Sequence, residues 1–352
     1  MPQPPDFHAL SRQIKHWGQE LGFQQVGICN TDLAEAENYL NAWLAQDYHG
    51  EMSYMSRHGP KRSRPDELVT GTLRIISLRM NYWPSDDFAI DELLNTPDRA
   101  YIARYALGRD YHKLLRQRLQ ALAARIQTQI GSFGYRVFVD SAPVLERAIA
   151  EKSGLGWIGK NTNLIHEKAG SYFFLGEIYT DLPLPVDAPA KNHCGTCQAC
   201  IDICPTRAIV APYQLDARRC IAYLTIELEG PIPVEFRASL GNRVFGCDDC
   251  QAICPWNRFA AMTAELDFKP RHHLDCITLV ELFRLSAEQF DHLSEGSTLR
   301  RLGYERFLRN LAVGLGNAAP DPKALHALHT RSNDPSPLVR EHVAWAIEQY
   351  RA

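Results

Sequence analysis

Two short cysteine runs place the tightest limits on what this chain can fold into. The stretch "CGTCQACIDICPTRAI" (194–209) has the spacing C-x2-C-x2-C-x3-C-P, and "CDDCQAICPWN" (247–257) repeats its ending. Bacterial ferredoxins use this spacing to hold cubane iron–sulfur clusters, and the cysteine before the proline reaches the neighbouring cluster. The runs therefore predict a ferredoxin-like module that carries two 4Fe-4S clusters.

The predicted ligand sets follow from aligning the second run on the first. Val244 falls where a cysteine is expected, and Cys220, between the runs, can replace it. We expect the first cluster to be held by Cys194, Cys197, Cys200 and Cys254. We expect the second to be held by Cys204, Cys220, Cys247 and Cys250. Structural zinc is the alternative, but zinc prefers paired C-x2-C knuckles. The remaining thiols, Cys29 and Cys276, are expected to be buried small hydrophobic residues.

Length and composition indicate a multidomain cytoplasmic protein. A chain of 352 residues with 45% hydrophobic content predicts two or three domains. Neither a secretory signal nor a twin-arginine leader is visible, and no apolar run is long enough to span a membrane. A net charge of −3 means that any nucleic acid must be held by local basic patches. We expect a monomer with no membrane partner.

Hydrophobic periodicity predicts an α+β fold with three domains. Helices are expected near 7–21, 32–46 and 108–130 and from Pro143 to Gly154, and strands at 23–29, 72–82, 135–140 and 171–180. The predicted domains are an α/β domain at 1–185, the two-cluster domain at 186–295 and a C-terminal α-helical HEAT-like repeat at 296–352. A proline-rich linker is expected at 181–193, and Ser336 and Pro337 are expected to start the last helix.

Several motifs resemble the epoxyqueuosine reductase family. They are "YMSRHGPKRSRPDEL" (54–68), "ARYALGRDYHKLL" (103–115), "VDSAPVLERAIAEKSGLGWIGKNTNLI" (139–165), the cysteine runs and "RRCIAYLTIE" (218–227). The resemblance implies a cobalamin-binding α/β domain related to the reductive dehalogenases. It further implies reduction of epoxyqueuosine to queuosine at the wobble position of tRNA, with cobalamin and two 4Fe-4S clusters as cofactors. A flavodoxin- or ferredoxin-type protein would supply low-potential electrons.

The resemblance also implies roles for individual residues. Asp140, at a strand end, is the expected proton donor, and partial desolvation would raise its pKa; the alternative is that it only caps the next helix. A cobalamin site with a histidine ligand typically has the motif D-x-H-x-x-G. Residues 47–49 and 110–112 match its first three positions, but neither match has the final glycine. The expected cobalamin contacts are Arg57, Tyr105, Asp140, Lys160, Asn161, Leu164, Cys247 and Asp248.

Clusters of basic residues are the expected tRNA-binding surface. Arg104, Arg300 and Arg301 are the named candidates, within patches that include Arg62 and Arg309. Tyr101, Tyr105 or Tyr304 could stack on a base splayed out of the anticodon loop. Two other functions are kept as alternatives: a small-molecule reductive dehalogenase and a non-catalytic ferredoxin-type electron carrier.

Overall fold

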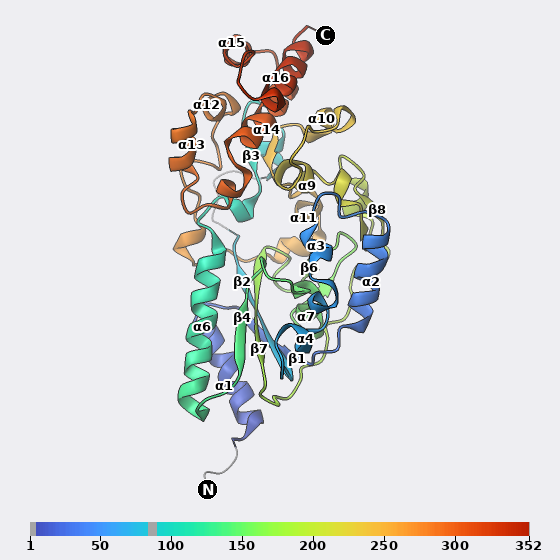
Figure 1. Ribbon diagram of the computed structural model, residues 1–352, viewed down its shortest axis with the longest axis vertical. Helices are drawn as coiled ribbons and strands as arrows, with labels where there is room; N and C mark the ends of the chain where they lie inside the picture. Colours follow the sequence, from blue (N-terminus) through green and yellow to red (C-terminus); the bar gives the residue numbers. More distant parts are fainter. Residues whose placement is uncertain (1–4, 84–89, 352) are drawn as a thin grey trace.

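A four-stranded antiparallel sheet forms the base of the molecule. The computed structural model describes residues 5–83 and 90–351 (Figure 1). The sheet order is β1 (Gln25–Cys29), β2 (Arg74–Asn81), β7 (Phe173–Thr180) and β4 (Tyr135–Phe138). All neighbours pair antiparallel, and both central strands are almost entirely buried because each face is covered by helices. This arrangement confirms the α+β class.

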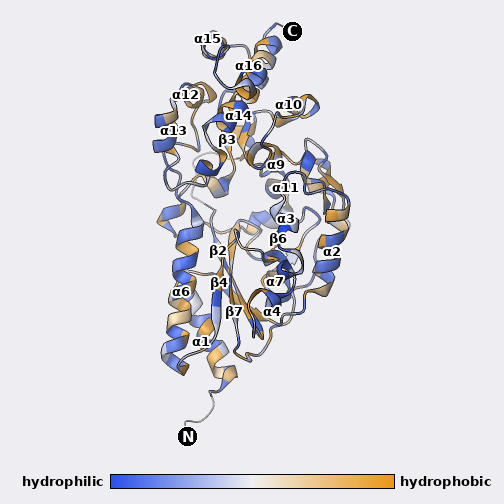
Figure 2. Ribbon diagram, in the orientation of Figure 1, coloured by the Kyte–Doolittle hydropathy of each residue, from blue (hydrophilic) through white to orange (hydrophobic). Residues whose placement is uncertain are grey.

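One face of the sheet packs on α1 (Phe7–Glu20) and α6 (Tyr111–Ile130). The 3,4 spacing of Leu115, Leu119, Leu122 and Ile126 gives α6 an apolar stripe, and all four side chains are fully buried. Figure 2 shows the contrast between hydrophobic β7 and the hydrophilic outer surface of α6. Gly131 ends α6, and a short connection returns the chain as β4 alongside the helix.

The other face packs on α7 (Glu146–Lys152), with α2 (Ala34–Ala45) further out. The prediction that this helix starts at Pro143 was wrong, because residues 141–145 form the turn that carries the chain from β4 to α7. Short elements complete this part of the chain: α3 (Tyr54–Arg57), α4 (Pro65–Leu68), α5 (Ile90–Leu94), β3 (Tyr101–Ile102), β5 (Trp157–Ile158) and β6 (Leu164–Ile165).

The cysteine module lies between the sheet and the C-terminal helices (Figure 1). Its elements are α8 (Ala199–Asp202), β8 (Ile209–Ala211), β9 (Gln214–Leu215), α9 (Ile221–Ile226), α10 (Val234–Leu240), β10 (Arg243–Phe245) and α11 (Asp249–Ala252). β10 pairs in parallel with β3. The expected linker has no regular structure but is held in place, since Asp187 contacts Lys15 at 2.5 Å and the backbone N–H of Ile28 at 2.9 Å.

The C-terminal part is helical, as predicted from about residue 297 onward, and its first two helices lie within the expected two-cluster domain. It contains α12 (Leu279–Phe283), α13 (Ala287–Leu293), α14 (Tyr304–Asn317), α15 (Pro322–Thr330) and α16 (Pro337–Gln349). Ser336 caps α16 by accepting a hydrogen bond from the Val339 N–H, which confirms the expected cap. The core of these helices also includes Ile102 and Val244, so it extends into the two preceding regions. No helix within the described residues combines the length and apolarity needed to cross a bilayer.

Candidate active site and iron–sulfur centres

Asp140 lies just beyond the end of β4 and faces the first turn of α6. Its Oδ2 accepts a hydrogen bond from the Tyr111 hydroxyl at 2.7 Å and lies 3.2 Å from His112 Nε2. Tyr111 is itself stacked between His112 and Phe174 of β7. The carboxylate thus bonds to α6, and the N-cap residue of α7 is Leu145, which makes no side-chain hydrogen bond to that helix. The alternative that Asp140 only caps the next helix was therefore wrong.

His112 bridges two carboxylates. Its Nδ1 lies 2.6 Å from Asp110 Oδ1, and its Nε2 contacts Asp140. A neutral imidazole has only one N–H, so two carboxylate partners favour the doubly protonated ring. Burial disfavours the charged form, but the hydrogen bonds to Asp110 and Asp140 outweigh it and raise the pKa of His112 to about 9.

The pKa of Asp140 is lowered, whereas from the sequence we expected it to be raised. Partial burial pushes it upward, but hydrogen bonds from His112 and Tyr111 and the positive charge of His112 hold it below its usual range. The resting pair is therefore an aspartate and an imidazolium, and the proton lies on the histidine. Asp140 also has a positive φ of 36°. Such backbone strain in a non-glycine residue is concentrated at functional sites.

Segments far apart in sequence converge on Asp140. Arg301 follows α13 in a 3-10 turn and forms an ion pair with Glu227, at the end of α9, at 2.9 Å. The positive charge of Arg301 contributes to the low pKa of Asp140. Tyr105 is half-buried, and burial and the negative charge of Asp140 raise its pKa. The site is thus bordered by the sheet domain, the cysteine module and the C-terminal region.

Four cysteines of the predicted first set surround one cavity. A cavity of about 50 Å³ is lined by Cys194, Cys197, Cys200 and Cys254, together with His193, Trp256 and Lys160. Trp157 directs its indole N–H at the Cys194 sulfur at 3.5 Å. Soft sulfur ligands around a space of this kind fit an iron–sulfur cluster, and N–H groups near the sulfurs tune its potential.

The second set also gathers in one place. Cys247 and Cys250 are partly buried. Burial and then the neighbouring thiols, Cys220 first, raise the pKa of Cys250. Cys204 likewise raises the pKa of Cys220, after burial itself. The Cys204 sulfur accepts a hydrogen bond from the Ala208 N–H at 3.2 Å. Of the two leftover thiols, Cys29 is buried as expected, whereas Cys276 is partly exposed.

The "GWIGKN" loop holds both cysteine runs. Lys160 Nζ donates to the carbonyls of Gly195 and Cys197 at 2.7 and 2.9 Å, and Asn161 donates to the Cys250 carbonyl at 3.0 Å. Leu164 is buried in a small apolar cluster. These side chains therefore position the cysteine loops. Their role as cobalamin contacts stays a prediction.

Asp248 and Arg104 are buried where β3 meets the cysteine module. Asp248 accepts hydrogen bonds from the Tyr101 hydroxyl and the Arg104 N–H, both at 2.8 Å. The Arg104 guanidinium lies 4.4 Å above the Trp83 ring, and only 4% of the residue is exposed. Tyr101 is 1% exposed, so the expectation that it stacks on a base was wrong. The burial of Arg104 likewise counts against a phosphate contact.

The predicted basic patches are only partly at the surface. Arg309 is fully buried because its guanidinium donates to the carbonyls of Leu224, Leu228 and Gly230. Arg62 is buried in the same manner, bound to the Tyr54 carbonyl. Including these two in an RNA-binding surface was wrong. Arg57, Arg300 and Arg301 remain exposed.

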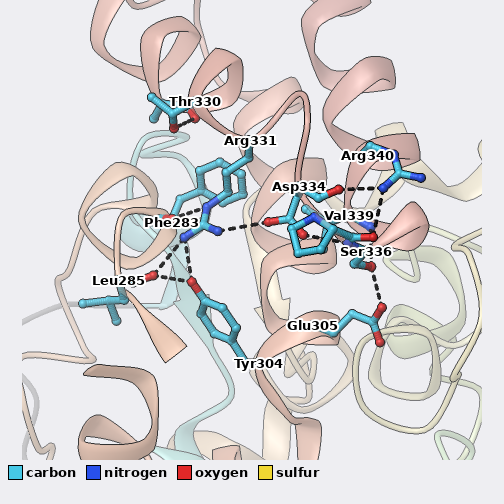
Figure 3. A network of polar contacts seen from close by, with 12 residues as sticks. Phe283, Leu285, Tyr304, Glu305, Thr330, Arg331, Asp334, Ser336, Val339 and Arg340 are labelled. Carbon is cyan, nitrogen blue, oxygen red and sulfur yellow. Dashed lines mark hydrogen bonds and ion pairs between the residues drawn. The ribbon is translucent and has the colours of Figure 1, made fainter. Parts of the chain in front are cut away.

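Tyr304 takes part in a network that joins α14 to α12 and α15. Its hydroxyl donates to the Leu285 carbonyl at 2.5 Å and accepts from Arg331 at 2.6 Å (Figure 3). Arg331 also contacts Asp334, near the start of α16. The side chain therefore has a structural role, and its predicted stacking on RNA is not favoured.

Sequence reasoning missed four polar residues of this site: Asp110, Tyr111, His112 and Glu227. Asp110 caps α6 by accepting from the His112 N–H at 2.9 Å. An Asp-Tyr-His sequence at a helix start was a signal for clustered polar groups. The short connection from α6 to β4 was a second signal, because it makes the strand run antiparallel to the helix and brings the start of α6 near the end of β4.

Comparison with known proteins identifies the family. Residues 62–141 match the family model described as Epoxyqueuosine reductase QueG, DUF1730, and residues 193–257 match the 4Fe-4S double cluster binding domain. The epoxyqueuosine reductase of Pseudomonas aeruginosa is 63% identical over 348 residues, which cover 99% of this chain and 96% of the relative.

Solved structures of the same family superpose over nearly the whole chain. An epoxyqueuosine reductase crystallised with an epoxyqueuosine-modified tRNA-Tyr stem loop superposes with a TM-score of 0.89 at 29% identity, covering 98% of this chain and 91% of that one. The Bacillus subtilis enzyme, described with an aspartate catalytic loop swung out of the active site, superposes with a TM-score of 0.88 at 28% identity and the same coverage. The chain belongs to the epoxyqueuosine reductase family of oxidoreductases.

Proposed function

We propose that this protein reduces epoxyqueuosine to queuosine at the wobble position of tRNA, with Asp140 as the group that protonates the leaving oxygen. The observation that carries the proposal is the Asp140 carboxylate held by Tyr111 and His112 beside the two-cluster module. The relative crystallised with a modified tRNA stem loop supports the substrate. Opening an epoxide to an alkene consumes two electrons and two protons when the oxygen leaves as water.

The cofactors would supply the electrons, and the chain would supply the protons. Cobalamin would provide a strongly reducing cobalt centre, and two 4Fe-4S clusters would deliver single electrons from a flavodoxin- or ferredoxin-type donor. We assign one cluster to the four cysteines around the cavity and the other to Cys204, Cys220, Cys247 and Cys250. His112 holds a proton at neutral pH and passes it through Asp140 to the substrate oxygen. We expect a cytoplasmic monomer.

The direct test is turnover of a defined RNA. The anaerobically purified protein, loaded with iron, sulfide and cobalamin, should convert an epoxyqueuosine-containing anticodon stem loop to queuosine in the presence of a low-potential reductant. Mass spectrometry of the digested nucleosides measures the product. Loss of halide from halogenated aromatics, with no change in the RNA, would instead support a dehalogenase. If the loaded protein turns over neither substrate, the remaining interpretation is a non-catalytic ferredoxin-type electron carrier.

The charge of His112 predicts a pH dependence of stability. Its folded pKa of about 9 lies above the ordinary value of 6.5. The ion pair therefore contributes stability that is complete below pH 6.5 and is lost as the pH rises through about 9. We expect the free energy of unfolding of the wild type to fall between these values, and His112→Gln to flatten that fall. His326→Gln, at an exposed position on α15, is the control and should keep the wild-type curve.

Arg300 gives a matched test of the RNA surface. It is exposed in the 3-10 turn that also carries Arg301. Arg300→Glu should weaken stem-loop binding and reduce the slope of log affinity against log salt by about one, because a phosphate contact is lost. Arg12→Glu, at an exposed position on α1, which lies at the lower end of the molecule in Figure 1, should change neither quantity. Equal effects of the two variants would place the RNA elsewhere.

A further inference from the structure

Two glutamates lie behind Asp140, Glu177 fully buried and Glu146 partly buried, and the steps described above do not use them. Glu177 is in the middle of β7, directly opposite Ser77 of β2 on one side and Phe138 of β4 on the other. Asp140 follows Phe138 by two residues. Glu146 is the first residue of α7, the helix that covers this face of the sheet. The three carboxyl groups thus occupy one corner of the structure, between the sheet and α7.

The glutamates lack the partners that a buried carboxylate needs. Glu177 and Ser77 are both 0% exposed. Within residues 5–83 and 90–351, neither carboxyl oxygen of Glu177, nor the Ser77 hydroxyl, nor Oε2 of Glu146 has a hydrogen-bond partner. An isolated ionised carboxylate is very costly in such surroundings, so these groups bind protons instead.

Repulsion among the three carboxyl groups also favours protonated Glu146 and Glu177 beside an ionised Asp140. Burial and then the negative charge of Asp140 raise the pKa of Glu146 to about 8, although the Arg147 charge and the Asp140 N–H oppose this. Burial, Glu146 and Asp140 raise the pKa of Glu177 well above its ordinary value. Among the three carboxyl groups, only Asp140 has its pKa lowered, because two side-chain hydrogen bonds and the charges of His112 and Arg301 outweigh its burial, so it takes the negative charge. The other titratable groups around this corner are Cys29, His112, Arg147 and Tyr179.

We propose that Glu146 and Glu177 form a buried store of two protons that recharges Asp140 during turnover. The use of the stored protons rests on the proposed function. His112 carries one proton toward Asp140, yet replacing both C–O bonds of the epoxide by an alkene and water takes two. The second proton leaves the Glu146 carboxyl for Asp140, and Glu177 returns a proton to Glu146. Glu177, by way of Glu146, and His112 are each reprotonated from solvent before the next cycle, while the two electrons come from the low-potential donor. The glutamates act through Asp140 and do not touch the substrate.

Infrared spectroscopy tests the store without any substrate. At neutral pH exposed carboxyl groups are ionised, so the C=O stretch of a protonated carboxyl reports only buried acids such as these. We expect Glu146→Gln and Glu177→Gln each to remove part of this band from the purified protein. Glu67→Gln, at an exposed position on α4, should leave it unchanged. If neither buried variant alters the band, both glutamates are ionised and the store does not exist.

The pH dependence of turnover tests whether the store is used. Without Glu146 the second proton must come from solvent, so the rate of Glu146→Gln should fall about tenfold per pH unit near neutrality, while the wild-type rate stays level. A parallel pH profile for the variant and the wild type would overturn the use of the store. A wild type that never reduces the RNA would contradict the proposed function and leave the infrared result standing.

Discussion

Replacing Asp140 with asparagine should lower the rate of epoxyqueuosine reduction about 100- to 10,000-fold, the usual contribution of a general acid. Asparagine keeps the shape of the side chain and an oxygen that can accept the Tyr111 hydrogen bond. It cannot relay a proton from His112 to the leaving oxygen. The measurement is single-turnover conversion of the modified stem loop by protein with its full iron content.

The control for this variant is Asp66→Asn, an exposed aspartate on α4. It should turn over at the wild-type rate, since its charge lies on the surface. Iron content and stem-loop affinity should be unchanged in both variants, which separates loss of proton transfer from loss of structure. An Asp140→Asn protein within about threefold of the wild type would remove Asp140 as the acid.

Replacing Cys220 with alanine should cost the protein one complete cluster. The assignment gives two clusters of four irons each, so iron content should fall from about eight to about four atoms per chain. Cys220 is the proposed ligand that lies outside both cysteine runs, at the N-terminus of α9 beside the other thiols of its set. The remaining cluster, around the cavity with Cys194 and Cys254, should survive. Reduction of the RNA should be lost because electron transfer through the module is broken.

Cys276→Ala is the matched control, because this thiol lies outside both sets and is partly exposed. It should retain about eight irons and full activity. Iron and acid-labile sulfide, determined anaerobically together with the electron paramagnetic resonance signals of the reduced clusters, give the count. Eight irons in the Cys220 variant would show that another residue completes the second cluster.

Local chemistry made much of the fold predictable from the sequence. Ser336 and Pro337 start α16 as expected, because a cap bond joins residues only three positions apart. The apolar stripe of α6 depends on the 3.6-residue period alone and was equally clear. The cysteine spacing indicated the two-cluster module for the same reason, and the family match at residues 193–257 confirms it.

Burial could not be predicted for the basic residues. Arg309 was interpreted as part of an RNA-binding surface because it clusters in sequence with Arg300, Arg301 and Arg306. The structure surrounds its guanidinium with three carbonyls that belong to the cysteine module. Arg104 is buried in a similar way against Trp83. Whether a long cationic side chain faces water or the protein depends on distant backbone that no local pattern encodes.

The sequence by itself determined the chemical groups available to this protein, which are eight clustered thiolates and a carboxylate at a strand end. It also determined the main helices, through the helical spacing of their hydrophobic residues. Tertiary structure alone decided the protonation of the site. Asp140 meets Tyr111 and His112 across 29 and 28 positions of chain, and Arg301 reaches the same site from the C-terminal region. These contacts reversed the expected direction of the Asp140 pKa, because a carboxyl group responds to the charges and hydrogen bonds around it in space.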